Sequence, residues 1–80
     1  MILKYMREAM KCAKYVILPD DGTFYGEIPA FRGVYANEKT LEECRQTLRE
    51  VLEEWLLFRI AQGLPIPVIN AVGIQIKEVA

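Results

Sequence analysis

Residues 41–62 constrain this chain more than any other segment, because they predict one long helix with well-marked ends. Thr40-Leu41-Glu42-Glu43 has the pattern of a capping box, in which the Thr40 hydroxyl accepts from the Glu43 amide and the Glu43 carboxylate reaches back. Gly63 is the expected left-handed residue that ends the helix. The stripe predicted to face inward consists of Leu41, Cys44, Leu48, Val51, Leu52 and Trp55.

The second half of this helix is apolar in nearly every direction around its axis. A helix that is apolar all round must be covered all round, and a small sheet covers only one side. The rest must meet the N-terminal helix, a second copy of the chain or a different protein. We therefore expect a homo-oligomer, a dimer or tetramer. Its expected interface consists of Leu56, Leu57, Phe58, Ile60, Met6 and Met10.

The first half of the chain predicts a helix followed by an antiparallel meander. Apolar residues at spacings of three and four predict an amphipathic helix over residues 2–12. β-Branched and aromatic residues predict strands at 13–18 and 23–28, separated by the turn Pro19-Asp20-Asp21-Gly22. Gly26 within the second strand predicts a close approach of another group to the sheet. A brief third strand is expected at 34–36 and a turn at 37–39.

After the long helix, Pro65-Ile66-Pro67 predicts an extended connector. Val72, Ile74 and Ile76 then alternate with polar residues or glycine, which predicts a half-buried last strand over 72–77. The expected fold is a single α+β domain over residues 1–80. Its elements follow the order helix, three-stranded antiparallel meander, long helix, fourth strand.

Composition argues against several classes of function. The chain of 80 residues has no histidine, which removes the commonest general base and metal ligand. Lys plus Arg number 10 and Asp plus Glu 11, without the basic excess of nucleic-acid binders. No apolar run is long enough to span a membrane, and no signal peptide is recognised. We expect a cytoplasmic protein that is not an enzyme, with no metal, no cofactor and no direct contact with nucleic acid.

The two cysteines, Cys12 and Cys44, are far apart in sequence and lack the spacing of a redox or zinc motif. They are interpreted as buried, inert thiols in a reducing compartment. Tyr15, Tyr25 and Tyr35 each fall on a predicted strand. Tyrosine is favoured at protein interfaces, but packing on the sheet surface explains these residues equally well.

The order of several short motifs resembles the HicB-like antitoxin domain. They are Asp21-Gly22-x-Phe24-Tyr25-Gly26-Glu27-Ile28-Pro29, then Gly33-Val34-x-Ala36, then Thr40-Leu41-Glu42-Glu43-Cys44, and later Leu48, Val51-Leu52-Glu53, Trp55, Gly63 and Pro65-x-Pro67. The resemblance covers residues 13–67. Arg32 stands where the family often has proline, and Glu38 where it often has glycine, which we interpret as loop divergence.

The resemblance implies a partial RNase H-like fold and a HicA-like ribonuclease toxin as partner. Longer members add a DNA-binding domain. This sequence ends at Ala80, so DNA binding is not expected. The expected partner interface is Tyr25, Glu27, Arg32 and Tyr35. One alternative is an orphan homo-oligomer of structural or unknown role. The other is a ligand-binding or enzymatic domain with a pocket between the N-terminal helix and the sheet.

Overall fold

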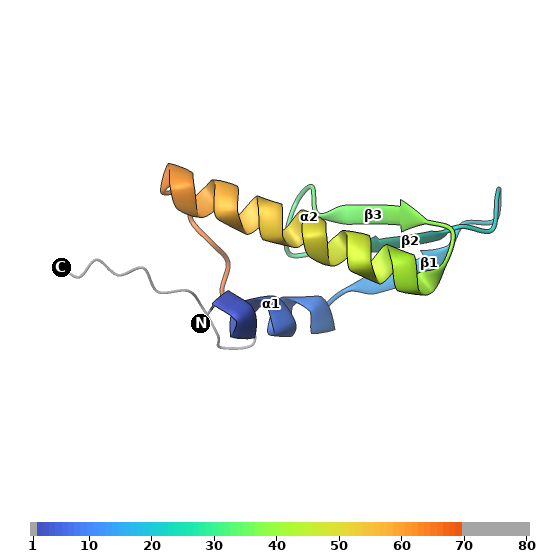
Figure 1. The fold of residues 1–80 in the computed structure, drawn as a ribbon, viewed down its shortest axis with the longest axis horizontal. Helices are drawn as coiled ribbons and strands as arrows, with labels where there is room; N and C mark the ends of the chain where they lie inside the picture. Colours follow the sequence, from blue (N-terminus) through green and yellow to red (C-terminus); the bar gives the residue numbers. More distant parts are fainter. Residues whose placement is uncertain (1, 70–80) are drawn as a thin grey trace.

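The computed structural model describes residues 2–69, which form two helices and a three-stranded antiparallel sheet (Figure 1). The elements are α1 (Ile2–Lys11), β1 (Lys14–Ile17), β2 (Phe24–Glu27), β3 (Tyr35–Glu38) and α2 (Leu41–Gln62). The predicted α+β class and the order helix, three strands, long helix are confirmed. The fourth strand expected at 72–77 lies outside the described residues.

The strands follow the order β1-β2-β3, and α2 packs over β3 and β2. Tyr15, Gly26 and Ala36 face one another across the three strands. A Cβ atom at Gly26 would lie 2.7 Å from Cδ1 of Tyr15 and 3.1 Å from Sγ of Cys44. The first distance is shorter than real Cβ contacts. The close approach predicted at Gly26 is therefore confirmed, and glycine is needed there for steric reasons.

The third strand differs from the prediction at its end. It begins at Tyr35 and continues through Asn37 and Glu38, where the sequence predicts a turn. The Asn37 side-chain amide explains the difference, because it donates to the Phe24 carbonyl at 2.8 Å and to the Thr23 hydroxyl at 2.8 Å. These bonds tie Asn37 to the neighbouring strand, and they override its low intrinsic preference for strands.

Helix α2 begins and ends at the predicted residues, but within residues 2–69 only half of the predicted capping box forms, because the Thr40 amide does not donate to the Glu43 carboxylate. The Thr40 hydroxyl accepts from the Glu43 amide at 3.1 Å, and Gly63 has φ 68°. The Gly63 and Leu64 amides donate to the Ile60 and Arg59 carbonyls, the pair of bonds found in a Schellman motif. These bonds satisfy carbonyls that the last turn would otherwise leave without partners.

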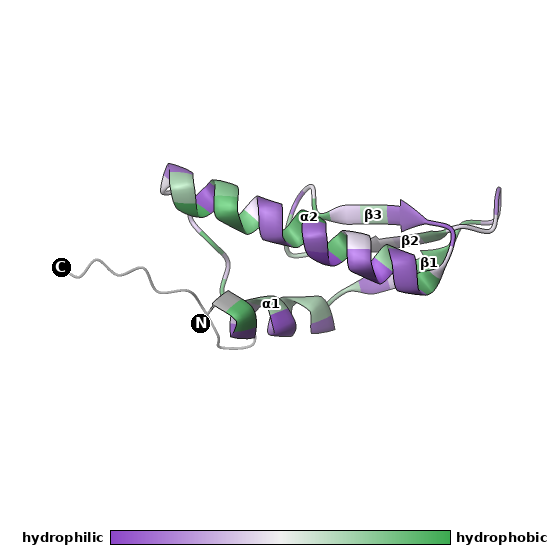
Figure 2. Ribbon diagram, in the orientation of Figure 1, coloured by the Kyte–Doolittle hydropathy of each residue, from purple (hydrophilic) through white to green (hydrophobic). Residues whose placement is uncertain are grey.

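The predicted inward stripe of α2 is confirmed at Cys44, Leu48 and Leu52, which are buried, and in part at Val51 and Trp55, which are half-buried. Leu41 is an exception. Its side chain is 40% exposed, because it is the first residue of the helix, beside the exposed cap Thr40. Figure 2 shows apolar residues recurring along α2 into its last turns, consistent with the sequence pattern.

Aromatic stacking joins α1 to the second half of α2. The Tyr5 ring stacks on Phe31 at 6.3 Å between centroids, and Phe31 stacks on Trp55 at 4.8 Å. The Arg59 guanidinium lies over the Trp55 ring at 4.8 Å, and its Nε donates to the Pro65 carbonyl. We call these four side chains, Tyr5, Phe31, Trp55 and Arg59, the stacking ladder.

The Tyr5 hydroxyl donates to the Pro67 carbonyl, so the ladder also holds the connector that follows α2. Burial raises the pKa of Tyr5 to about 12. Neither helix among residues 2–69 is long and apolar enough to cross a bilayer.

Both cysteines are free thiols, but their surroundings differ. Cys44 is buried between α2 and the sheet and donates to the Ala36 carbonyl at 3.5 Å. Burial raises the pKa of the Cys44 thiol, which keeps it protonated and unreactive. Cys12 is only half-buried, because it follows the last residue of α1. The prediction of two buried thiols is therefore wrong for Cys12.

Candidate functional site: two exposed surfaces

Two of the four side chains predicted to meet a partner stack on each other on the face of the sheet away from α2, which we call the outer face. The Tyr25 and Tyr35 rings have centroids 6.1 Å apart and planes inclined by 26°. They are diagonal neighbours in the ladder, where Tyr25 pairs with Asn37 and Glu27 pairs with Tyr35. The structure thus brings Tyr25, Glu27 and Tyr35 together on one surface.

This surface is open to solvent and carries a negative charge beside its aromatic rings. Tyr35 is 57% exposed, and the Tyr25 hydroxyl donates to Glu27 Oε1 at 3.3 Å. The pKa of Tyr25 is raised, first by partial burial and then by the charge of Glu27. A protonated phenol next to a carboxylate offers a donor and an acceptor on an aromatic platform, a combination suited to non-covalent protein binding.

Arg32 lies at the same end of the β2–β3 hairpin, in the exposed loop between Ile28 and Val34. The Ile28 amide donates to the Val34 carbonyl at 3.3 Å, and Gly33 takes φ 88° to close the loop. Within residues 2–69 Arg32 is fully available, since no hydrogen bond or ion pair of that part involves it. The loop therefore leaves Arg32 exposed at this end of the hairpin, without joining it to the tyrosines.

The second exposed surface is at the end of α2. Leu57 is 54% and Phe58 59% exposed, and Leu64 is 40% exposed. Leu64 follows the Gly63 cap, so the three exposed apolar residues all belong to the last turns of α2 and its end. We call Leu57, Phe58 and Leu64 the helix-end patch.

Three residues predicted for the oligomer interface belong instead to the interior of one chain. Leu56 is 1% and Met6 4% exposed, and Met10 packs half-buried against the same core. The sequence places them on an apolar face, but α1 and the stacking ladder cover that side of α2. Ile60 is half-buried, so only Leu57 and Phe58 of the predicted set are largely exposed.

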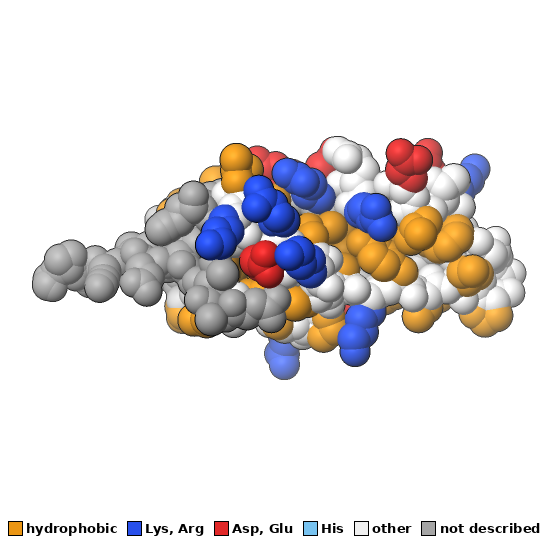
Figure 3. Space-filling view, turned by 90° about the horizontal axis from the view of Figure 1, so that it is seen from below, with side chains coloured by type: hydrophobic (Ala, Val, Ile, Leu, Met, Phe, Trp, Pro, Cys, Tyr) orange, Lys and Arg blue, Asp and Glu red, His pale blue; other side chains and the backbone are white. Residues whose placement is uncertain are grey.

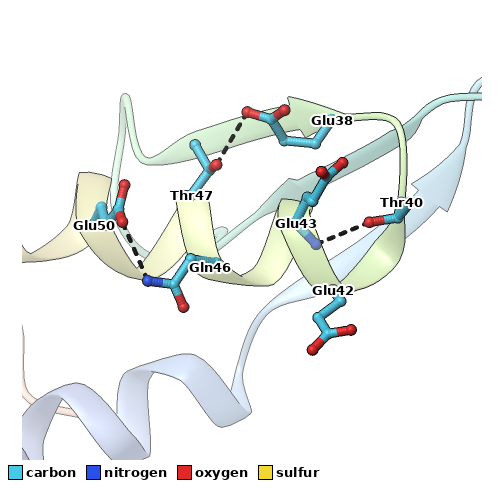
Figure 4. A pocket seen from close by; sticks show the side chains of 7 residues that line it. All are labelled: Glu38, Thr40, Glu42, Glu43, Gln46, Thr47 and Glu50. Carbon is cyan, nitrogen blue, oxygen red and sulfur yellow. Dashed lines mark hydrogen bonds between the residues drawn. The ribbon is translucent and has the colours of Figure 1, made fainter.

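A groove at the start of α2 is the surface that the sequence interpretation missed (Figure 4). It has a volume of about 620 Å³ and is lined by Glu38, Thr40, Glu42, Glu43, Gln46, Thr47 and Glu50. In Figure 4 the Glu43 side chain extends toward Glu38, and Glu42 points the other way. The Thr47 hydroxyl donates to Glu38 at 3.0 Å and Gln46 donates to Glu50 at 3.1 Å.

The groove could not be predicted from the sequence, because it forms only where β3 runs beside α2. Glu42, Glu43 and Glu50 belong to the exposed face of α2, whose side chains alone do not predict a groove. Among residues 2–69, no group of three or more acidic or cysteine side chains is arranged to hold a metal ion. The pocket expected in one alternative, between the N-terminal helix and the sheet, is not where this groove lies.

The opposite sign of charge gathers around α1. Lys4, Arg7, Lys11 and Lys14 are all exposed, and Lys11 forms an ion pair with Glu8 at 3.0 Å. The view from below shows Lys and Arg side chains grouped on the side of the molecule that carries α1 (Figure 3). The chain therefore has a basic side and an acidic groove, although its net charge is only -1.

Comparison with known proteins gives consistent matches. The family model described as UPF0150-like matches residues 4–67. UPF0150 protein ssr1258 of Synechocystis is 37% identical over 41 residues, which cover 49% of this chain and 59% of that protein. The crystal structure of TTHA0281 from Thermus thermophilus superposes with a TM-score of 0.90 at 39% identity. That superposition covers 96% of this chain and 95% of the other.

Proposed function

The chain belongs to the UPF0150-like family, and on that premise we propose that it is an antitoxin-type protein-binding module of the HicB kind. It would neutralise a HicA-like ribonuclease toxin by covering the toxin's active surface. The stack of the half-buried Tyr25 on the exposed Tyr35, beside Glu27, is the observation that carries this proposal. Tyrosine is among the residue types that most often dominate the binding energy at protein interfaces.

The charge of the outer face supports a basic partner. Glu27 accepts from Tyr25 and remains exposed enough to meet a cation, and a ribonuclease must carry positive charge to hold its substrate. Complementary charge speeds encounter and selects partners more than it adds affinity. The tyrosines would then supply the affinity and Glu27 the selection.

We infer a non-enzymatic role in a cytoplasmic toxin–antitoxin system. The whole sequence lacks histidine, and the buried thiol of Cys44 donates to a backbone carbonyl rather than to a base. Two free thiols favour a reducing compartment. No cofactor, metal or nucleic-acid contact enters this proposal.

The test is co-expression and binding with a HicA-like toxin encoded beside the gene. We expect Tyr25→Ala and Tyr35→Ala each to weaken binding about 30-fold, the effect of losing about 2 kcal/mol at an interface hot spot. Phe58→Ala is the matched control, because Phe58 is 59% exposed and Tyr35 57%. If toxin binding is unchanged by both tyrosine substitutions but is lost in Phe58→Ala, the interface is the helix-end patch and not the outer face.

The second candidate is an orphan homo-oligomer of structural or unknown role, and the helix-end patch favours it. Leu57 and Phe58 are adjacent large apolar side chains that stay more than half exposed in the described part of the chain. Such a patch is a common sign of association between proteins. The chain has a mass of 9.2 kDa, and light scattering of the purified protein should give at least twice that value. A particle of one chain mass would rule out self-association.

A further inference from the structure

Strand β1 is the least covered element of the sheet. It lies at one edge, and α2 packs over β3 and β2 rather than over it. Val16 points to the outer face and is 53% exposed, and Ile17 points to the other face and is 62% exposed. An edge strand that is apolar and open on both faces is a template for pairing with another chain.

The hydrogen-bond pattern shows which backbone groups this edge offers. The Leu18 amide donates to the Thr23 carbonyl at 2.8 Å, so the backbone amide and carbonyl of Leu18 point toward β2. In an antiparallel ladder the direction of the backbone groups alternates from residue to residue. The amides and carbonyls of Val16 and Lys14 therefore also point toward β2. Tyr15 and Ile17 therefore turn their amides and carbonyls toward the free edge. The hydrogen bond from the Ile28 amide to the Val34 carbonyl, at the other end of β2, gives the same alternation of backbone directions.

We propose that β1 pairs antiparallel with β1 of a second copy, about a two-fold axis at Val16. Tyr15 of one copy then lies opposite Ile17 of the other, and the outward amides and carbonyls form four hydrogen bonds. Val16 meets Val16 of the second copy directly on the axis. The two three-stranded sheets become one sheet of six strands. Aromatic and β-branched residues facing each other across strands are favourable pairs.

The sequence of β1 is self-complementary in this register. Lys14 falls opposite Leu18 of the second copy, so no like charges face each other. The other edge is less suited, since α2 covers one face of β3 and the strand ends at the charged Glu38. This inference rests only on the self-association proposed above and needs no toxin. It uses a surface separate from the helix-end patch.

Opposite charges on the axis test the register. Val16→Glu and Val16→Lys each bring two like charges together, and the exposed position should tolerate both in the folded chain. By light scattering, we expect either variant alone to have half the wild-type particle mass. An equimolar mixture should return to the wild-type mass, because unlike charges then meet across the axis. Val16→Thr, which keeps the branched shape, should retain the wild-type mass.

Phe58→Glu separates this inference from self-association in general. If the particle mass of both Val16 variants equals that of the wild type, the β1 pairing is overturned. If Phe58→Glu then halves the mass, the chain self-associates through the helix-end patch instead. A mass that falls in the Val16 variants and stays low on mixing also overturns it. That outcome leaves the edge to another occupant, such as the strand expected at 72–77 or a toxin strand. Circular dichroism of each variant confirms that it is folded before the masses are compared.

Discussion

The two halves of α2 lie in different surroundings. The first half runs over β3 and β2, and Cys44 and Leu48 are buried there in one narrow stripe. The second half is held by the stacking ladder on one side and exposes Leu57 and Phe58 on the other. The comparison teaches that one helix can form part of the core at its start and leave apolar side chains exposed at its end.

The largest expected effect comes from the first half. Leu48→Ala should lower the free energy of unfolding by about 2–5 kcal/mol, because Leu48 is fully buried and the change leaves a cavity. Leu57→Ala should change it by less than about 0.5 kcal/mol in the single chain, because Leu57 is largely exposed. Urea unfolding at a fixed, low protein concentration measures both. Equal losses at the two positions would remove the distinction between the halves.

A smaller effect is expected from the stacking ladder. Trp55→Leu keeps an apolar side chain but loses the stack on Phe31 and the contact with Arg59. We expect a loss of about 0.5–1.5 kcal/mol, the value of one aromatic pair beyond its burial. Thermal unfolding monitored by circular dichroism gives the value. Phe24→Leu, a half-buried aromatic residue without a ring contact in the described structure, is the control, and an equal loss there would deny the ladder a specific role.

The smallest effect should appear only at high pH. Tyr5 has a pKa of about 12 in the folded chain against 10 in the unfolded chain. The unfolded state therefore loses its proton first, so this contribution to stability is complete below pH 10 and is lost as the pH rises toward 12. Tyr5→Phe removes the titrating group and the hydrogen bond to Pro67. Its stability should fall less steeply over this range, and identical slopes in the two proteins would contradict the assignment.

Much of the fold could be predicted from local chemistry. The Thr40 hydroxyl cap and the left-handed Gly63 each act over a few residues, and the structure confirms both. The end of β3 could not be predicted, because the bond from Asn37 to Phe24 joins residues 13 positions apart. Leu41 was misjudged because helical periodicity does not show where the covering sheet stops.

The sequence by itself determined that this chain has more apolar surface on its long helix than a small sheet can cover. Only the tertiary structure decided which of those side chains stay exposed. Leu56 and Leu57 are neighbours with the same chemistry, yet Leu56 is buried and Leu57 is not. Periodicity fixes the direction of a side chain from its own helix axis. What lies in that direction depends on how α1, the sheet and the connector pack together.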